Sequence, residues 1–246
     1  QVRVLPVDAQ VTQWLCTLEE IGEAQPAIRL GMVMINGLGL EAGERVAGCR
    51  PAEGYQSTED LQQRSQLSAR DLGVLAKANA LTSLAGNRRQ AWWQVRGLDA
   101  GVGLTAGAVS LDATPDLPAL STGEAVKADY ASLGLTLGPH PMSLLRARLT
   151  ARRLLSAREI QQMPNGRPAR CAGIVVTRQR PATASGVVFA TLEDETGNTN
   201  VIIWSDLVEQ QRRELLSAPL LGVYGVVQRQ GQVVHLLAKR LVGLTE

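Results

Sequence analysis

The stretch from residue 186 to residue 204 constrains the fold of this chain more than any other. It contains two runs rich in β-branched and aromatic residues, 187–192 and 199–204, with Asp-Glu-Thr-Gly-Asn (194–198) between them. These turn residues, with Gly197 among them, predict a β-hairpin with a short bulged loop. A hairpin of this length needs further strands to bury its apolar face, so the neighbouring segments must supply them.

Alternation along the first run separates the two faces of this hairpin. Three apolar residues share the face that we expect to enter a core: Val188, Ala190 and Leu192. The other face presents Phe189, the only phenylalanine of the chain. We therefore expect Phe189 to point outward from the sheet.

The flanking segments extend the hairpin into a small barrel. A strand is expected at 171–177, a helix at 205–216, and a final pair of strands at 220–229 and 233–242. The order β-β-β-α-β-β is typical of a closed, five-stranded OB-fold β-barrel, a common binder of single-stranded nucleic acid. We expect such a domain over residues 168–246.

The OB type predicts where a nucleic acid would lie, because the loop after the first strand and the faces of the second and third strands form its groove. The candidate DNA-binding residues there are Arg178, Arg180, Thr183, Ser185 and Phe189. The two arginines would hold phosphates, and Phe189 would stack a base. A Phe189 ring packed under a loop of the protein is the alternative.

A second pattern, Ile35-Asn36-Gly37-Leu38-Gly39, lies between two short helical segments. An apolar-x-Gly-apolar-Gly run in this setting is the signature of a helix-hairpin-helix. Its glycines permit positive φ and close backbone approach, so hairpin N–H groups can point at a phosphate. The candidate phosphate-binding residues are Asn36, Gly37, Leu38 and Gly39, and an ordinary turn between two helices is the alternative.

A second hairpin is expected at residues 77–81, after a helix that Ser68 caps. Asn79 stands where a glycine would adopt the left-handed conformation more freely. The two hairpins together predict a tandem helix-hairpin-helix domain.

The helix after the second hairpin places two cations at its N-terminus. Asn87 caps it, and Arg88 and Arg89 in its first turn oppose the helix dipole. A bound phosphate would relieve that conflict, so both arginines are candidate DNA-binding residues, and arginines extended into water are the alternative. Trp92 or Trp93 is expected to close the helical bundle.

Charge is distributed unevenly along the 246 residues, although the net charge is only +2. Residues 143–180 contain nine arginines and one acid, whereas residues 97–126 contain four acids and neither lysine nor arginine. A basic island beside an acidic, Gly/Pro/Thr-rich linker indicates a polyanion-binding module on a solvated tether. A solvated helix face is the alternative for the arginines at 146–158.

These patterns predict an α+β multidomain chain. The expected parts are the tail of a preceding domain at 1–30, the tandem helix-hairpin-helix domain at 31–97, a linker at 98–126, a helical connector at 127–167 and the OB-fold barrel at 168–246.

Several expectations concern what the chain lacks. No apolar run is long enough to span a membrane, and the three cysteines lie too far apart to indicate a zinc site or a disulfide framework. His140 has no cluster of ligands around it, so no metal-binding and no catalytic residue is expected. A cytoplasmic location follows from the cysteine usage. The start Gln-Val-Arg, without Met, suggests a fragment of a longer protein.

Several motifs, in order along nearly the whole chain, resemble the C-terminal part of bacterial C-family DNA polymerases. The resemblance is to the error-prone, damage-inducible branch (the ImuC type), which is related to the replicative polymerase III alpha subunit. The segments that carry it are 29–39, 88–93, 128–141 and 178–197.

The resemblance implies a non-catalytic region of a translesion polymerase that grips primer–template duplex through its hairpins and single-stranded template through its OB domain. Nucleotidyl transfer would use Mg²⁺ on palm aspartates outside this fragment. The implied partners are an inactive Y-family-like accessory protein and a RecA-like accessory protein. The sliding clamp would be reached only indirectly, since residues 116–120 are a poor match to a clamp-binding peptide.

Two departures from the family pattern bear on affinity. Asn79 replaces a usual glycine, and the barrel loop has Ala182 and Ser185 where relatives often have glycine and lysine. Fewer backbone and cationic contacts favour a second hypothesis, a protein-docking scaffold that recruits the accessory proteins of the mutasome. A third hypothesis is an RNA-binding OB module of the anticodon-binding kind, against which the 35–39 hairpin argues.

Overall fold

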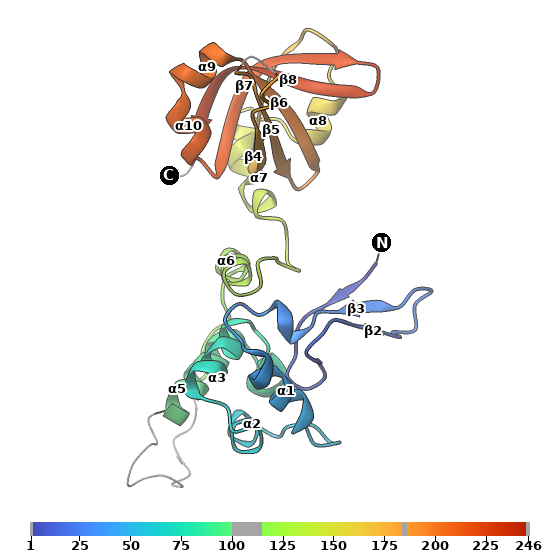
Figure 1. Cartoon of the computed structure of the whole chain (residues 1–246), viewed down its shortest axis with the longest axis vertical. Coiled ribbons are helices and arrows are strands. Elements are labelled where there is room, and N and C mark those ends of the chain that lie inside the picture. The colour runs from blue at the N-terminus through green and yellow to red at the C-terminus, as the bar shows by residue number, and fades with distance from the viewer. Residues whose placement is uncertain (1, 100–114, 184–185, 245–246) are drawn as a thin grey trace. The chain divides into compact units, whose positions relative to one another are not determined.

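The computed structural model of the chain describes residues 2–99, 115–183 and 186–244, which form two compact units (Figure 1). The first unit is Gln1–Gly138 and the second is Pro139–Glu246. These limits differ from the expected boundaries in two respects: residues 1–30 join the helical unit, and the expected connector at 127–167 is shared between both units. No helix in the described ranges is both long and apolar enough to cross a membrane.

The first unit combines a small sheet with a set of short helices. In the sheet, the strand order is β1-β3-β2, with β1 parallel and β2 antiparallel to β3. The elements are β1 (Val4–Leu5), β2 (Thr17–Glu19), β3 (Ala27–Arg29), the 3₁₀ helix η1 (Met32–Met34), α1 (Leu40–Gly48), α2 (Thr58–Ser65), α3 (Ala69–Lys77), α4 (Thr82–Ala85), α5 (Arg88–Asp99) and α6 (Thr122–Leu133).

Residues before position 31 belong to this unit because they share its core. Val7 and Ala9 are buried in one cluster with Leu72 and Leu75 of α3. The Ala9 N–H donates to the carbonyl of Ala80 at 2.8 Å. Burying those side chains elsewhere would require a second core, which so short a segment cannot build.

Helix α6 begins inside the segment expected to be a linker. Ser121 and Glu124 form a capping box, in which the Ser121 hydroxyl accepts from the Glu124 N–H and the Glu124 carboxylate accepts from the Ser121 N–H. This reciprocal pair satisfies two backbone donors that the helix start leaves without a partner. The helix ends at Gly134, whose φ of +73° is the left-handed conformation that glycine tolerates best.

The second unit is a closed barrel with two helices before its first strand. The strand order is β4-β5-β6-β8-β7, with β6 and β8 parallel and the other pairs antiparallel. The predicted OB-fold β-barrel after a helical hairpin domain is confirmed. The elements are α7 (Pro141–Ala151), α8 (Ala157–Gln162), β4 (Pro168–Gln179), β5 (Val188–Asp194), β6 (Gly197–Ile203), α9 (Ser205–Gln210), α10 (Arg212–Ser217), β7 (Leu220–Gln230) and β8 (Val233–Gly243).

The helix expected at 205–216 is broken into α9 and α10. The break lies at Gln211, whose side-chain amide donates to the Leu241 carbonyl at 2.9 Å and accepts from the Leu241 N–H at 2.7 Å. These two bonds tie the break to strand β8 and place both helices against the barrel.

Candidate nucleic-acid interface

The outer face of strand β5 carries an open aromatic side chain. Val188, Ala190 and Leu192 are buried in the barrel core, whereas Phe189 is 37% exposed. Phe189 is paired with Gln179 on β4 and with Ile202 on β6. The Phe189 ring therefore lies on the surface of three adjacent strands, and a loop does not bury it.

A second aromatic residue joins this face. Trp204 directly follows β6 in extended backbone, at φ −69° and ψ 154°, and is 55% exposed. Residues two apart on an extended chain point to the same side, so Trp204 shares the side of Ile202 and hence of Phe189. We name Phe189, Ile202 and Trp204 the barrel face. Trp204 ends the predicted strand 199–204, and its spacing of two from Ile202 was the sequence signal that places it on this face.

Arg180 lies beside the end of the barrel face. A Cβ placed on Gly186 would be 3.3 Å from Arg180 Nη2 and 3.4 Å from the Cβ of Ser205. The guanidinium therefore approaches the backbone of Gly186, close to the residue that follows Trp204. Thr183 in the same loop is exposed, and Ser185 lies outside the described residues.

Arg178, a predicted phosphate contact, also holds the end of a helix. Its Nε donates to the carbonyl of Leu215 and its Nη2 to the carbonyl of Ala218, both at 2.6 Å. These carbonyls lie at the C-terminal end of α10, where a helix leaves acceptors without partners and favours a cation. Two of the five guanidinium N–H donors thus cap α10.

The first hairpin has the conformation that its glycines predicted. Gly37 has a φ of +86°, and Gly39 in extended backbone precedes α1. In the described part of the chain, the N–H groups of Gly37, Gly39 and Leu40 have no acceptor, whereas the Leu38 N–H donates to Ile35 at 3.3 Å. Three backbone donors therefore remain open at the hairpin and the start of α1.

Asn36 does not belong to this open set, because its backbone and side-chain N–H groups both donate to α6. Its backbone N–H donates to the carbonyl of Ser132 at 2.8 Å, and its side-chain amide donates to the carbonyl of Ala131 at 3.3 Å. Asn36 therefore fixes the hairpin to the C-terminal end of α6.

The second hairpin confirms the left-handed conformation expected at Asn79, which has a φ of +63°. Its side-chain carbonyl accepts from the Thr82 hydroxyl at 2.7 Å, which links the turn to the start of α4. The carbonyl of Ala80 accepts from Ala9, so residues before position 31 cover one side of this turn.

Arg88 and Arg89 are paired within the protein. Arg88 donates to the carboxylate of Asp129 and, at 3.2 Å, to the carbonyl of Ala125, and its side chain is only 10% exposed. Arg89 donates to the exposed carboxylate of Glu124 at 3.1 Å. Acids of α6 thus relieve the conflict with the α5 dipole, an outcome that differs from both a bound phosphate and full solvation.

Sequence reasoning missed a basic groove between α3 and α5. The groove has a volume of about 430 Å³. Its lining includes one aromatic and three cationic side chains: Trp92, Arg70, Lys77 and Arg96. Lys77 Nζ lies 4.8 Å, and Arg96 Cζ 5.1 Å, from the centre of the Trp92 ring. Trp92 also packs against the core of the unit, as expected for one of the two tryptophans, whereas Trp93 is 55% exposed. The spacing of seven between Arg70 and Lys77 places both on one face of α3. This spacing could have predicted a basic face on that helix.

The acidic turn between β5 and β6 does not fit a magnesium site. The carboxylates of Asp194 and Glu195 accept hydrogen bonds from Arg146, and Asp194 also accepts from the Ala157 and Thr196 N–H groups. Because these oxygens already accept hydrogen bonds, few lone pairs remain to coordinate Mg²⁺, which requires a nearly ideal octahedral shell of oxygen ligands. Within the described ranges, His, Cys, Asp and Glu form no group of three or more that could hold a metal ion.

Models of two known protein families match the two units. The helix-hairpin-helix motif family matches residues 1–91, and a family described as OB-fold nucleic acid binding domain matches residues 169–242. The chain therefore combines a helix-hairpin-helix domain with an OB-fold domain.

Curated relatives narrow the class further. Error-prone DNA polymerase from Alkalilimnicola ehrlichii is 45% identical over 240 residues, which cover 98% of this chain and 23% of the relative. The enzyme of the same name from Pseudomonas aeruginosa is 48% identical over 241 residues, with the same coverage of each chain. Nearly the whole chain therefore matches one region of the error-prone DNA polymerases, and it spans 23% of the length of these relatives.

One solved structure, asparaginyl-tRNA synthetase from Pyrococcus horikoshii, matches 37% of this chain and 23% of its own, with 19% identical residues. Its TM-score of 0.32 is too low to carry a functional argument.

Proposed function

We propose that this chain is the C-terminal, non-catalytic nucleic-acid-binding region of an error-prone translesion DNA polymerase. The barrel would hold the single-stranded template, and the helical unit would hold the primer–template duplex. The single observation that carries the proposal is the barrel face, which leaves two aromatic side chains open beside Arg180.

The chemistry of the barrel face suits a strand without sequence preference. Phe189 and Trp204 offer flat apolar surfaces on which any base can stack, and each stacked base is worth roughly 1–3 kcal/mol. Arg180 would supply a charged contact to the phosphate backbone. Arg178 would contribute through the position of α10 more than through a phosphate of its own.

The helical unit suits a backbone-directed grip on duplex. The open N–H groups of Gly37, Gly39 and Leu40 face the N-terminal end of α1, where the helix dipole favours an anion. The α3–α5 groove adds cationic side chains on the same unit. Such contacts position a duplex but do not read its sequence.

The test is a titration of the 246-residue chain against an oligothymidylate of about 15 nucleotides, near the upper site size of one OB fold. Trp204→Ala should weaken binding by roughly 5- to 100-fold without changing the salt slope, since stacking removes no phosphate contact. Trp93→Ala is the matched control, because Trp93 is equally exposed but lies in the other unit. Equal affinities for the two variants would refute the role of the barrel face.

Duplex binding is tested separately with a blunt duplex at two salt concentrations. The Arg70→Gln and Lys77→Gln double variant should lower the slope of log K against log salt by about 1.8, at roughly 0.9 per lost phosphate contact. The exposed Lys127→Gln serves as the control for loss of charge on the same unit. An unchanged slope in the double variant would remove the α3–α5 groove from the duplex-binding surface.

The remaining parts of the proposal concern the parent polypeptide. It would carry out Mg²⁺-dependent DNA synthesis in the cytoplasm during the response to DNA damage, on palm aspartates outside this chain. Its partners would be the inactive Y-family-like and RecA-like accessory proteins, with the sliding clamp engaged only through the former. Polymerase assays of the full-length protein with an aspartate-to-alanine palm variant would test this assignment.

The second candidate function is a docking scaffold for the accessory proteins. Pairing of Arg88 and Arg89 with α6, and of Arg178 with α10, favours it because these hydrogen bonds compete with a phosphate for the guanidinium groups. Capture of purified accessory proteins by this chain after nuclease treatment, with no measurable affinity for DNA at low salt, would select it over the first candidate.

A further inference from the structure

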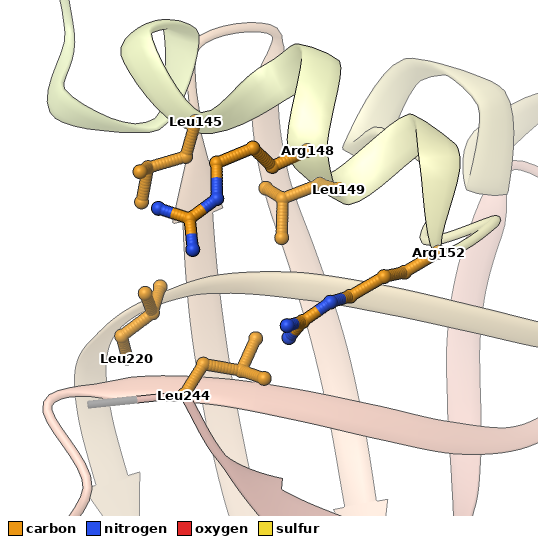
Figure 2. Close-up of a pocket in the computed structure, with 6 residues that line it drawn as sticks. All are labelled: Leu145, Arg148, Leu149, Arg152, Leu220 and Leu244. Atoms are coloured by element: carbon orange, nitrogen blue, oxygen red, sulfur yellow. The ribbon is translucent and has the colours of Figure 1, made fainter. Parts of the chain in front are cut away.

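A small hollow in the second unit lies between α7 and the ends of strands β7 and β8 (Figure 2). Its volume is about 50 Å³, and it is lined by Leu145, Arg148, Leu149, Arg152, Leu220 and Leu244. At about 10–15 Å³ for each water-sized probe, it has room for three or four heavy atoms, the size of one aliphatic side chain. We name it the α7 pocket.

The two arginines at its rim have no acidic partner. Figure 2 shows both guanidinium groups directed from α7 toward the side where Leu220 and Leu244 lie. Among the residues that the structure describes, neither guanidinium has an acceptor. By contrast, Arg146 on the same helix donates to both Asp194 and Glu195. Like charges four residues apart on a helix repel each other, so an anion between Arg148 and Arg152 would relieve that repulsion.

The α7 pocket lies at the opposite end of the barrel from the proposed single-strand site. Ile174 of β4 is paired with Leu220 on one side and with Glu193 on the other, whereas Gln179 is paired with Phe189. Five residues of strand separate Ile174 from Gln179, roughly 16 Å at 3.3 Å per residue. The two cations of the α7 pocket therefore lie away from the aromatic residues of the barrel face.

The chemistry of the pocket selects among anions. A phosphate gains nothing from four leucine side chains, whereas a peptide with a carboxylate next to an aliphatic side chain satisfies both parts of the site. Guanidinium and carboxylate groups form paired, charge-assisted hydrogen bonds. We propose that the α7 pocket docks an acidic, leucine-containing peptide segment of a partner protein, with a carboxylate between Arg148 and Arg152 and the aliphatic side chain among the leucines.

The test uses the whole 246-residue chain and a fluorescein-labelled peptide with a Glu-Glu-Leu-Glu core in Gly/Ser flanks. The double variant Arg148→Gln, Arg152→Gln should bind the peptide about tenfold more weakly, the effect of losing two ion pairs at an exposed site. Arg158→Gln with Arg167→Gln is the matched control, since both arginines are exposed on the same unit and neither lines the pocket. Its peptide affinity should change less than twofold. Circular dichroism melting of each variant establishes that the fold is retained.

Two further probes make the assignment specific. A peptide with Ser in place of Leu should bind wild-type chain about as weakly as the double variant binds the original peptide. The oligothymidylate should bind the double variant and the control equally. Absence of peptide binding, equal losses in both double variants, or no dependence on the leucine would overturn the proposal. A tenfold loss confined to the oligothymidylate would assign the two arginines to nucleic acid and would also overturn it.

Discussion

Replacement of Arg146 by methionine should destabilise the barrel unit. The Arg146 guanidinium joins this helix to the β5–β6 turn through hydrogen bonds to Asp194 and Glu195. The bond to Glu195 and the nearby charges raise the pKa of Arg146, so the group is charged at every accessible pH. The Asp194 side chain is 3% exposed, and that of Glu195 is 18% exposed.

The magnitude follows from what methionine leaves behind. Removing one partner of a buried ion pair typically costs about 3–5 kcal/mol, because the other charge stays buried and unpaired. Asp194 keeps donors from Ala157 and Thr196, and Glu195 is partly reached by water, so the cost is reduced. We expect a loss of about 2–3 kcal/mol in the free energy of unfolding of the second unit.

Scanning calorimetry of the full chain measures this loss as a shift of one transition. For a unit of this size, about 2–3 kcal/mol lowers Tm by roughly 10–20 °C. Arg148→Met is the matched control, because it is exposed two residues further along α7 and has no acceptor in the described structure, so its effect should stay below about 0.5 kcal/mol. A loss under about 1 kcal/mol for Arg146→Met, or equal losses for both variants, would refute the assignment of Arg146 as the link between α7 and the turn.

Three further predictions concern other parts of the chain. Burial raises the pKa of the Cys171 thiol to about 12, so a thiol reagent at about pH 8 should label the two exposed cysteines at once and Cys171 only after unfolding; labelling of all three thiols in the native chain would contradict this. Hydrogen bonds from the N–H and hydroxyl of Ser156 hold the pKa of Glu159 below its usual 4.5. The folded pKa is therefore the lower one, so the stability that Glu159 contributes is present above about pH 4.5 and lost as pH falls through the folded pKa. The urea midpoint of Glu159→Gln should accordingly depend less on acid pH than that of the wild type, and parallel curves would refute this. Finally, a Cβ on Gly225 would lie 2.2 Å from the Leu237 carbonyl oxygen of β8, whereas one on Gly222 meets its nearest atom at 3.4 Å. Gly225→Ala should cost at least about 2 kcal/mol by urea unfolding and Gly222→Ala under about 1, and the reverse order would contradict the packing.

The barrel was predictable because its signals are local. Alternation along 187–192 fixed which residues enter the core, and the turn with Gly197 fixed the register of the hairpin. Likewise, the glycines of the first hairpin predicted a left-handed backbone conformation, which Gly37 adopts. Asn79 adopts the same conformation in the second hairpin, because asparagine tolerates it better than most residues do.

The roles of individual arginines could not be predicted, because they depend on segments far away in the sequence. Arg178 meets α10 about 40 residues later, and Arg88 meets Asp129, 41 residues later. A sequence shows that these residues are cations but not which carbonyl or carboxylate lies within reach. The acidic segment that contains Glu124 was a partial signal. Glu124 lies in the first turn of α6, the helix that follows α5, and pairs with Arg89 at the start of α5.

The central claim is that a single strand lies across the barrel face, and photochemical cross-linking tests it most directly. The chain is irradiated with a bromodeoxyuridine-containing strand of about 15 nucleotides, and cross-linked residues are identified by mass spectrometry. Cross-links are expected at Phe189 or Trp204, and they should disappear at high salt. Cross-links confined to the α7 pocket or to the helical unit, with both aromatic residues unmodified, would contradict it.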